Sequence, residues 1–145
     1  MVQKNGLVIY LTYLGALPFL IAAFCSLIGI TELPYLGSTQ PLFYSYATLI
    51  ASFMAGTLWG YVMRSNSSNR TILFASVIIV LILWVLWGSS KTLPYSAFLV
   101  PLYLLLWCLD YWLLKYEYED LSYFKMRTGV TTIVIASLLI IYLKE

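Results

Sequence analysis

The chain has 145 residues, of which 62% are hydrophobic and only 10% are charged, and its mean hydropathy is +0.89. Soluble domains carry about 25% charged residues, so this composition excludes an ordinary soluble enzyme or binding domain. The net charge of +2 is too small to indicate nucleic acid binding, and the absence of histidine removes the commonest metal ligand and the usual general base near neutral pH.

Five apolar stretches, each long enough to cross a bilayer, follow one another with short polar connections. A membrane-spanning helix needs about 20 mostly apolar residues, so five such helices leave no room for a folded soluble domain. The sequence therefore predicts one all-α domain over residues 1–145, a polytopic transmembrane bundle of five helices with short loops. The predicted spans are approximately residues 6–30, 41–63, 71–87, 94–115 and 126–143.

The first span contains Pro18 near its middle. A proline has no backbone N–H to donate to the carbonyl four residues earlier, so this position is predicted to kink the helix. In membranes such kinks persist where neighbouring helices or side chains satisfy the freed carbonyl. The same reasoning predicts a kink at Pro101 in the fourth span.

Small residues recur every four positions in the second span, at Ser52, Gly56 and Gly60. Residues four apart share one helix face, and the last two form a G-x-x-x-G pattern. Small residues let helix backbones approach closely, and close packing drives helix association in lipid. This face is therefore predicted to be a helix-packing surface, either a seam inside the bundle or the contact face of a homodimer.

The fourth span contains Asp110, about one turn inside its charged end. A carboxylate in the membrane is costly, and it marks either a functional site or a buried ion pair. Arg127 is the first candidate partner, because consecutive antiparallel helices bring these two ends together, and Arg64 is the second. Two alternatives stay open, a structural ion pair and a carboxylate that binds a ligand or a proton.

Lysine and arginine are distributed unequally between the two sides that five spans create. The N-terminal side holds six and the other side holds two; in that order they are Lys4, Arg64, Arg70, Lys115, Lys125 and Arg127, against Lys91 and Lys144. Such residues collect on the cytoplasmic side of membrane proteins. The bias predicts a cytoplasmic N-terminus.

Three fragments and one acidic residue, taken in order, resemble the motifs of a known family. They are a G-x-x-P-F in the first span (Gly15, Pro18, Phe19), an S-F-x-x-G-x-x-W-G in the second (ending at Trp59 and Gly60), Asp110 in the fourth, and an R-x-x-x-T that opens the fifth (Arg127, Thr131). The family is a domain of unknown function in small bacterial inner-membrane proteins and in the mitochondrial transmembrane protein 69. The resemblance implies five helices in a bacterial inner membrane or, alternatively, a mitochondrial inner membrane.

These observations favour a protein without catalytic activity, because no catalytic constellation, metal site or cofactor motif is present in the sequence. The leading interpretation is a scaffold or accessory subunit that packs in the bilayer against another membrane protein or against itself. The alternative is a binder or transporter of a small lipophilic molecule, such as a quinone or a lipid, in a pocket between the kinked first and fourth helices and the second.

Overall fold

The computed structural model of the chain describes residues 6–64, 70–88, 95–115 and 120–144. Five α-helices and one small antiparallel sheet lie within these ranges, and all five helices are long and apolar enough to cross a membrane. The predicted all-α bundle of membrane-type helices is therefore confirmed. The elements are α1 (Gly6–Ile28), β1 (Glu32–Leu33), β2 (Gly37–Ser38), α2 (Thr39–Arg64), α3 (Arg70–Gly88), α4 (Tyr95–Lys115) and α5 (Leu121–Lys144).

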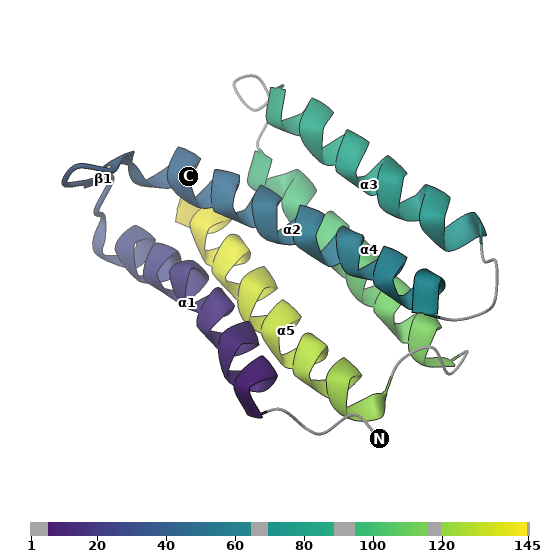
Figure 1. The fold of residues 1–145 in the computed structure, drawn as a ribbon. Coiled ribbons are helices and arrows are strands. Elements are labelled where there is room, and N and C mark those ends of the chain that lie inside the picture. Colours follow the sequence, from purple (N-terminus) through teal and green to yellow (C-terminus); the bar gives the residue numbers. More distant parts are fainter. Residues whose placement is uncertain (1–5, 65–69, 89–94, 116–119, 145) are drawn as a thin grey trace.

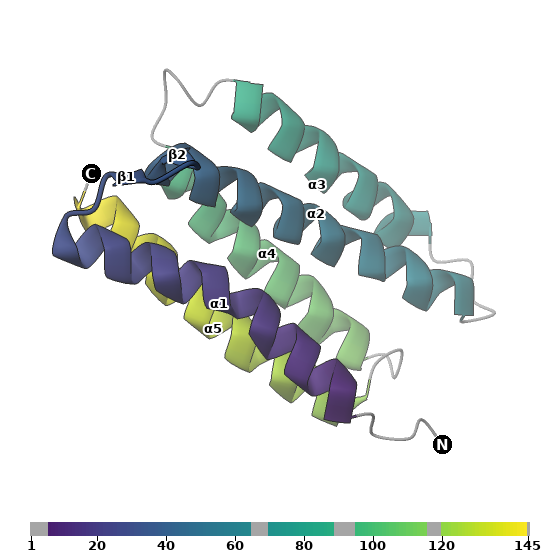
Figure 2. The same ribbon diagram turned by 60° about the vertical axis from the view of Figure 1, so that its left-hand side comes forward.

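The helices form a bundle in which α5 lies between α1 and α4, and α2 lies between α3 and α4 (Figure 1). The contact between α1 and α2 is much smaller than that between α1 and α5. Helix α3 packs mainly on α2, at the edge of the bundle. The first residue of α1 and the last residue of α5 lie at opposite ends of the bundle, as five crossings require (Figure 2).

The centre of the bundle is built on an alanine stripe of α2. Ala47, Ala51 and Ala55 recur every four residues and are fully buried. Their small side chains leave room for the ring of Tyr103 from α4, whose hydroxyl donates a 2.8 Å hydrogen bond to the carbonyl of Ala47. Phe19 of α1 meets the same ring edge-on, with 6.3 Å between the ring centroids. Three helices therefore meet at one aromatic contact.

The predicted glycine face of α2 lies elsewhere. Gly56 and Gly60 are exposed, and a Cβ added at either position would have no atom within 4 Å. Ser52 is half-buried, and its hydroxyl donates to the carbonyl of Thr48 in its own helix. The described residues therefore do not form the seam inside the bundle that was one of the two predicted alternatives. The adjacent stripe of Ala47, Ala51 and Ala55 packs inside the bundle instead, because the large core side chain of Tyr103 lies against it.

Two helix ends differ from the predicted boundaries because of local capping. Helix α1 ends at Ile28 because Gly29 adopts a positive φ of 76° and two reverse hydrogen bonds close the last turn, as in a Schellman motif. Helix α5 begins at Leu121 rather than near residue 126. Asp120 occupies the N-cap position, since its carbonyl accepts the first helical hydrogen bond from the N–H of Phe124. Its carboxylate accepts a hydrogen bond from the side-chain hydroxyl of Ser122.

A short hairpin joins α1 to α2 where the sequence indicated only a loop. In its turn the N–H of Leu36 donates to the carbonyl of Leu33 at 3.2 Å. Pro34 occupies the second turn position and Tyr35 the third, with a φ of 67°. Glycine is the usual residue at that position, because a positive φ brings a side chain too close to the backbone. The fully exposed Tyr35 is therefore held in a strained conformation.

Helix α1 contacts the backbone of α5 at Gly129. A Cβ added to this glycine would lie 2.7 Å from the hydroxyl oxygen of Tyr13, which is inside van der Waals contact. The absence of a side chain at Gly129 lets the hydroxyl end of Tyr13 approach the backbone of α5. The sequence analysis did not single out this glycine, although it sits in a helix that is otherwise rich in branched residues.

A double-mutant cycle tests this contact. We expect Gly129→Ala to destabilise the protein by about 1 kcal/mol, because overpacking outweighs the gain in helix propensity. In a Tyr13→Phe background the clashing oxygen is gone, so Gly129→Ala should instead stabilise the protein by about 0.5 kcal/mol. Thermal unfolding in detergent measures both values. The same effect in both backgrounds would show that the two residues do not touch.

Candidate functional site

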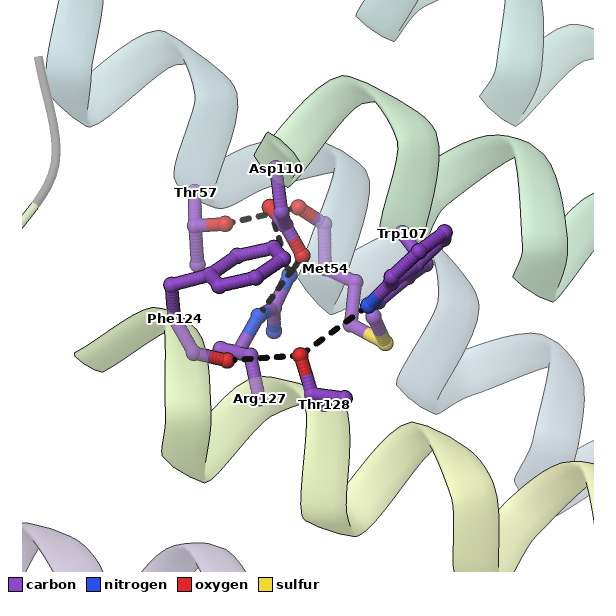
Figure 3. Close-up of polar contacts among 7 residues, drawn as sticks. All are labelled: Met54, Thr57, Trp107, Asp110, Phe124, Arg127 and Thr128. Atoms are coloured by element: carbon purple, nitrogen blue, oxygen red, sulfur yellow. Dashed lines mark hydrogen bonds and ion pairs between the residues drawn. The ribbon is translucent and has the colours of Figure 1, made fainter. Parts of the chain in front are cut away.

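The two charged residues that the sequence analysis paired lie in direct contact. The Nε of Arg127 donates to Oδ2 of Asp110 at 3.0 Å, and its Nη2 donates to Oδ1 at 3.3 Å (Figure 3). Asp110 is 0% exposed and Arg127 is 6% exposed. This two-pronged geometry suits a guanidinium and a carboxylate, and it neutralises both charges inside the bundle.

Helix position explains why the arginine is buried. Asp110 projects from α4 and Arg127 from α5, which run antiparallel and follow each other in the chain. Because α5 already begins at Leu121, Arg127 falls at the end of its second turn rather than at the membrane surface. The side chain of Arg64, the second candidate partner, lies outside the described part of the structure.

Aromatic side chains surround the ion pair. The guanidinium carbon of Arg127 lies 5.9 Å from the ring centroid of Tyr123, within the range of a cation–π contact. The indole N–H of Trp107 donates to the hydroxyl of Thr128 at 3.0 Å, and that hydroxyl donates to the carbonyl of Phe124 (Figure 3). Both oxygens of Asp110 accept from one guanidinium, so the carboxylate acts as a counter-ion rather than as a free base.

Arg127 also borders a partly open cavity of about 340 Å³ that is lined by α1, α2 and α5. Three polar residues line it: Thr12, Arg127 and Thr131. The remaining walls are glycine and apolar side chains, namely Val8, Leu11, Gly15 and Phe19 of α1, Ile50, Phe53 and Met54 of α2, and Val130 and Val134 of α5.

Thr131 stands out in this cavity wall because its hydroxyl makes no hydrogen bond to any described residue, although its oxygen is buried. The neighbouring hydroxyls of Thr128 and Thr132 donate to the carbonyls four residues earlier in α5, and Thr12 does the same in α1. A buried polar group without a partner costs about 1–3 kcal/mol. Such a group in a native structure calls for an explanation, and a missing binding partner is one.

Several residues singled out by the family resemblance meet at this cavity. Gly15, Phe19, Arg127 and Thr131 come from two helices and all line it. Gly15 also accepts a hydrogen bond at its carbonyl from the hydroxyl of Tyr46, at 2.8 Å, which ties α1 to α2 beside the cavity.

Other predicted residues lie away from the cavity. Gly60 and Trp59 are exposed on α2, and Trp59 borders a shallow groove toward α3 with Gly56. Pro18 and Pro101 lie inside α1 and α4, which continue through them as helices, so the kinks stay predictions. The pocket expected from the sequence lay between the first, second and fourth spans, whereas this cavity is lined by α1, α2 and α5. The difference arises because the lining depends on the spacing of the helices.

The chain was compared with known families, curated proteins and solved structures. A family model described as a protein of unknown function (DUF3429) matches residues 5–143. The match covers nearly the whole chain, so the chain belongs to this family, and the resemblance seen in the sequence is confirmed. Its link to transmembrane protein 69 stays a prediction. No curated protein and no solved structure matches the chain.

The ion pair yields a prediction for stability. Asp110→Asn and Arg127→Gln should each destabilise the protein by about 3 kcal/mol, because either change leaves one buried charge unpaired. The double variant should lose less than the sum of the two. Chemical unfolding in detergent measures these values, with the exposed cap Asp120→Asn as the matched control, since asparagine caps helices as well as aspartate. Strict additivity would mean that the pair does not interact.

Proposed function

We propose that this member of the DUF3429 family is an integral membrane protein that binds a small lipophilic molecule in the cavity between α1, α2 and α5, without catalysing a reaction. One observation carries the proposal. A mostly apolar cavity has a buried arginine and an unpartnered threonine hydroxyl in the same wall. Apolar walls with a few convergent polar groups are the usual composition of a small-molecule site.

The volume and lining of the cavity support this proposal. Its volume of about 340 Å³ lies within the range of ligand-binding pockets, which is about 300–1,000 Å³. Burying the Thr131 hydroxyl without a partner among the described residues costs free energy. A ligand that accepts a hydrogen bond from this hydroxyl removes that cost.

The surroundings of the cavity suit a ligand that arrives from the lipid. Three lining side chains, Val8, Leu11 and Phe53, are also exposed on the outer surface of the bundle. These side chains belong to α1 and α2, and the contact between these two helices is smaller than the contact between α1 and α5. A lipophilic molecule in the bilayer therefore reaches the cavity between these helices without passing through water.

The exposed glycine face of α2 favours a second candidate function, a scaffold or accessory subunit. Gly56 and Gly60 lie open on the surface, and Gly56 borders a groove of about 200 Å³ with Trp59 and residues of α3. Glycines contribute little apolar surface to lipid, but they allow a second helix to approach closely. The second copy of this chain is the partner that this face suits, because G-x-x-x-G faces pair with each other.

We place the protein in a bacterial inner membrane with its N-terminus in the cytoplasm. The six-to-two distribution of lysine and arginine supports this orientation. Among the described cations of that side, Arg70, Lys115 and Lys125 are exposed, and Arg127 is buried against Asp110.

Filling the cavity tests the ligand-binding proposal. Gly15 lines the cavity and has open space at its Cβ position, so Gly15→Leu should occupy the volume without unfolding the protein. Native mass spectrometry of protein purified in nanodiscs should show a bound small molecule on the wild type and its loss from this variant. Gly88→Leu, at an equally open glycine of α3 outside the cavity, should keep it. Equal occupancy of both variants would contradict the proposal.

The second candidate is tested by oligomeric state. Because Gly56 and Gly60 have open surroundings within one chain, Gly56→Leu and Gly60→Leu should leave the unfolding temperature within a few degrees of the wild type. A homodimer through this face should dissociate in both variants, as measured by single-molecule photobleaching in liposomes. If the wild type is monomeric at every protein-to-lipid ratio, the homodimer proposal is contradicted.

A further inference from the structure

We infer that the molecule bound in this cavity is electrically neutral and presents a carbonyl oxygen, as a ketone, a quinone or an ester does, to Arg127 and Thr131. The inference rests on the proposed function and specifies the chemistry of its ligand. It follows from the charge balance of the wall, from the hydrogen-bond donors in it and from their position along α5.

The charged side chains at the cavity wall already balance each other. The positive charge of Arg127 is already matched by Asp110 at 3.0 Å, and both residues are almost fully buried. An anionic ligand would place a second negative charge beside a neutral pair and leave the site with a net charge away from water. A cationic ligand would face the guanidinium. Burial of an unbalanced charge is costly in either case, so a neutral molecule is favoured.

The hydrogen-bonding groups in the wall select the ligand further. A guanidinium has five N–H donors and no acceptor, and the contact with Asp110 uses only those on Nε and Nη2. The Thr131 hydroxyl has no partner among the described residues, and its oxygen is buried in the cavity wall. A rotation about χ1, among the rotamers that threonine adopts in helices, turns it toward the ligand. A carbonyl oxygen has two lone pairs and can accept from both residues at once. An alcohol oxygen can also accept from Arg127, but its own proton then needs an acceptor, which among the lining side chains only the hydroxyls of Thr12 and Thr131 offer.

Position along the helix gives the ligand an orientation. Arg127 and Thr131 lie four residues apart, on one face of α5, whereas Val134 lies farther into the span. Phe19, the last lining residue of α1, is buried. The polar head of the ligand therefore binds near the start of α5, and its apolar part extends toward Phe19 and Val134.

Three probes with the same chain length test this assignment on the full chain in detergent. They are 2-undecanone, which is neutral with a carbonyl, undecane, which has no polar group, and undecanoate, which is anionic. The rise of the unfolding temperature with probe concentration gives each apparent Kd. We expect the wild type to bind the ketone roughly tenfold more tightly than either other probe, the factor that one good hydrogen bond supplies.

Two threonine variants separate recognition from folding. Thr131→Val keeps the shape but removes the hydroxyl, so it should lose most of the roughly tenfold preference for the ketone. Without probe it should unfold at a higher temperature than the wild type, because a buried unpartnered group is gone. Thr132→Val removes an exposed hydroxyl from the next residue and should keep the preference.

The outcomes that overturn the inference differ from those that overturn the proposed function. Equal affinity for ketone and hydrocarbon, with both lost in Gly15→Leu, would refute the carbonyl assignment and leave ligand binding in place. Tightest binding of undecanoate would refute neutrality in the same way. No binding of any probe by the wild type, or equal binding by Gly15→Leu and Gly88→Leu, would refute the proposed function and this inference together.

Discussion

The rest of the structure depends on the constraint that neither Asp110 nor Arg127 can be buried alone in the bundle. Their contact fixes the height of α5 against α4, because a shift by one helical turn would separate the two charges. Helix α1 in turn packs against α5, and Gly129 lies in this contact. The placement of three of the five helices therefore follows from one pair of side chains.

The same pair shapes the chemistry of the cavity. Arg127 contacts the carboxylate of α4 and also lines the cavity between α1, α2 and α5. Its charge is neutralised by Asp110, yet it keeps donors that the pair does not use. The two interpretations of Asp110 offered by the sequence are thus compatible. A structural ion pair can also set the polarity of a neighbouring binding site.

A feature could be predicted from the sequence when it depends on composition or on the order of the helices, and not when it depends on the distances between them. Span number and the Asp110–Arg127 contact could be predicted, because composition and the order of antiparallel helices determine them. The environment of Gly56 could not, since spacing tells which residues share a face and not what that face meets. The cavity and the Gly129 contact require the actual distances between helices. The start of α5 at Leu121 was not predicted, because the N-cap position of Asp120 shows only in the backbone hydrogen bond that its carbonyl accepts.

The strained turn between α1 and α2 has a mechanical consequence. Tyr35 projects from the hairpin just beyond the ends of two spans, where tyrosine rings settle between hydrocarbon and water. Moving the hairpin inward would bury its hydroxyl and backbone in lipid, and moving it outward would expose its ring to water. Because the hairpin is short, it transmits this resistance to both helices. The hairpin therefore opposes movement of α1 and α2 along the bilayer normal in either direction.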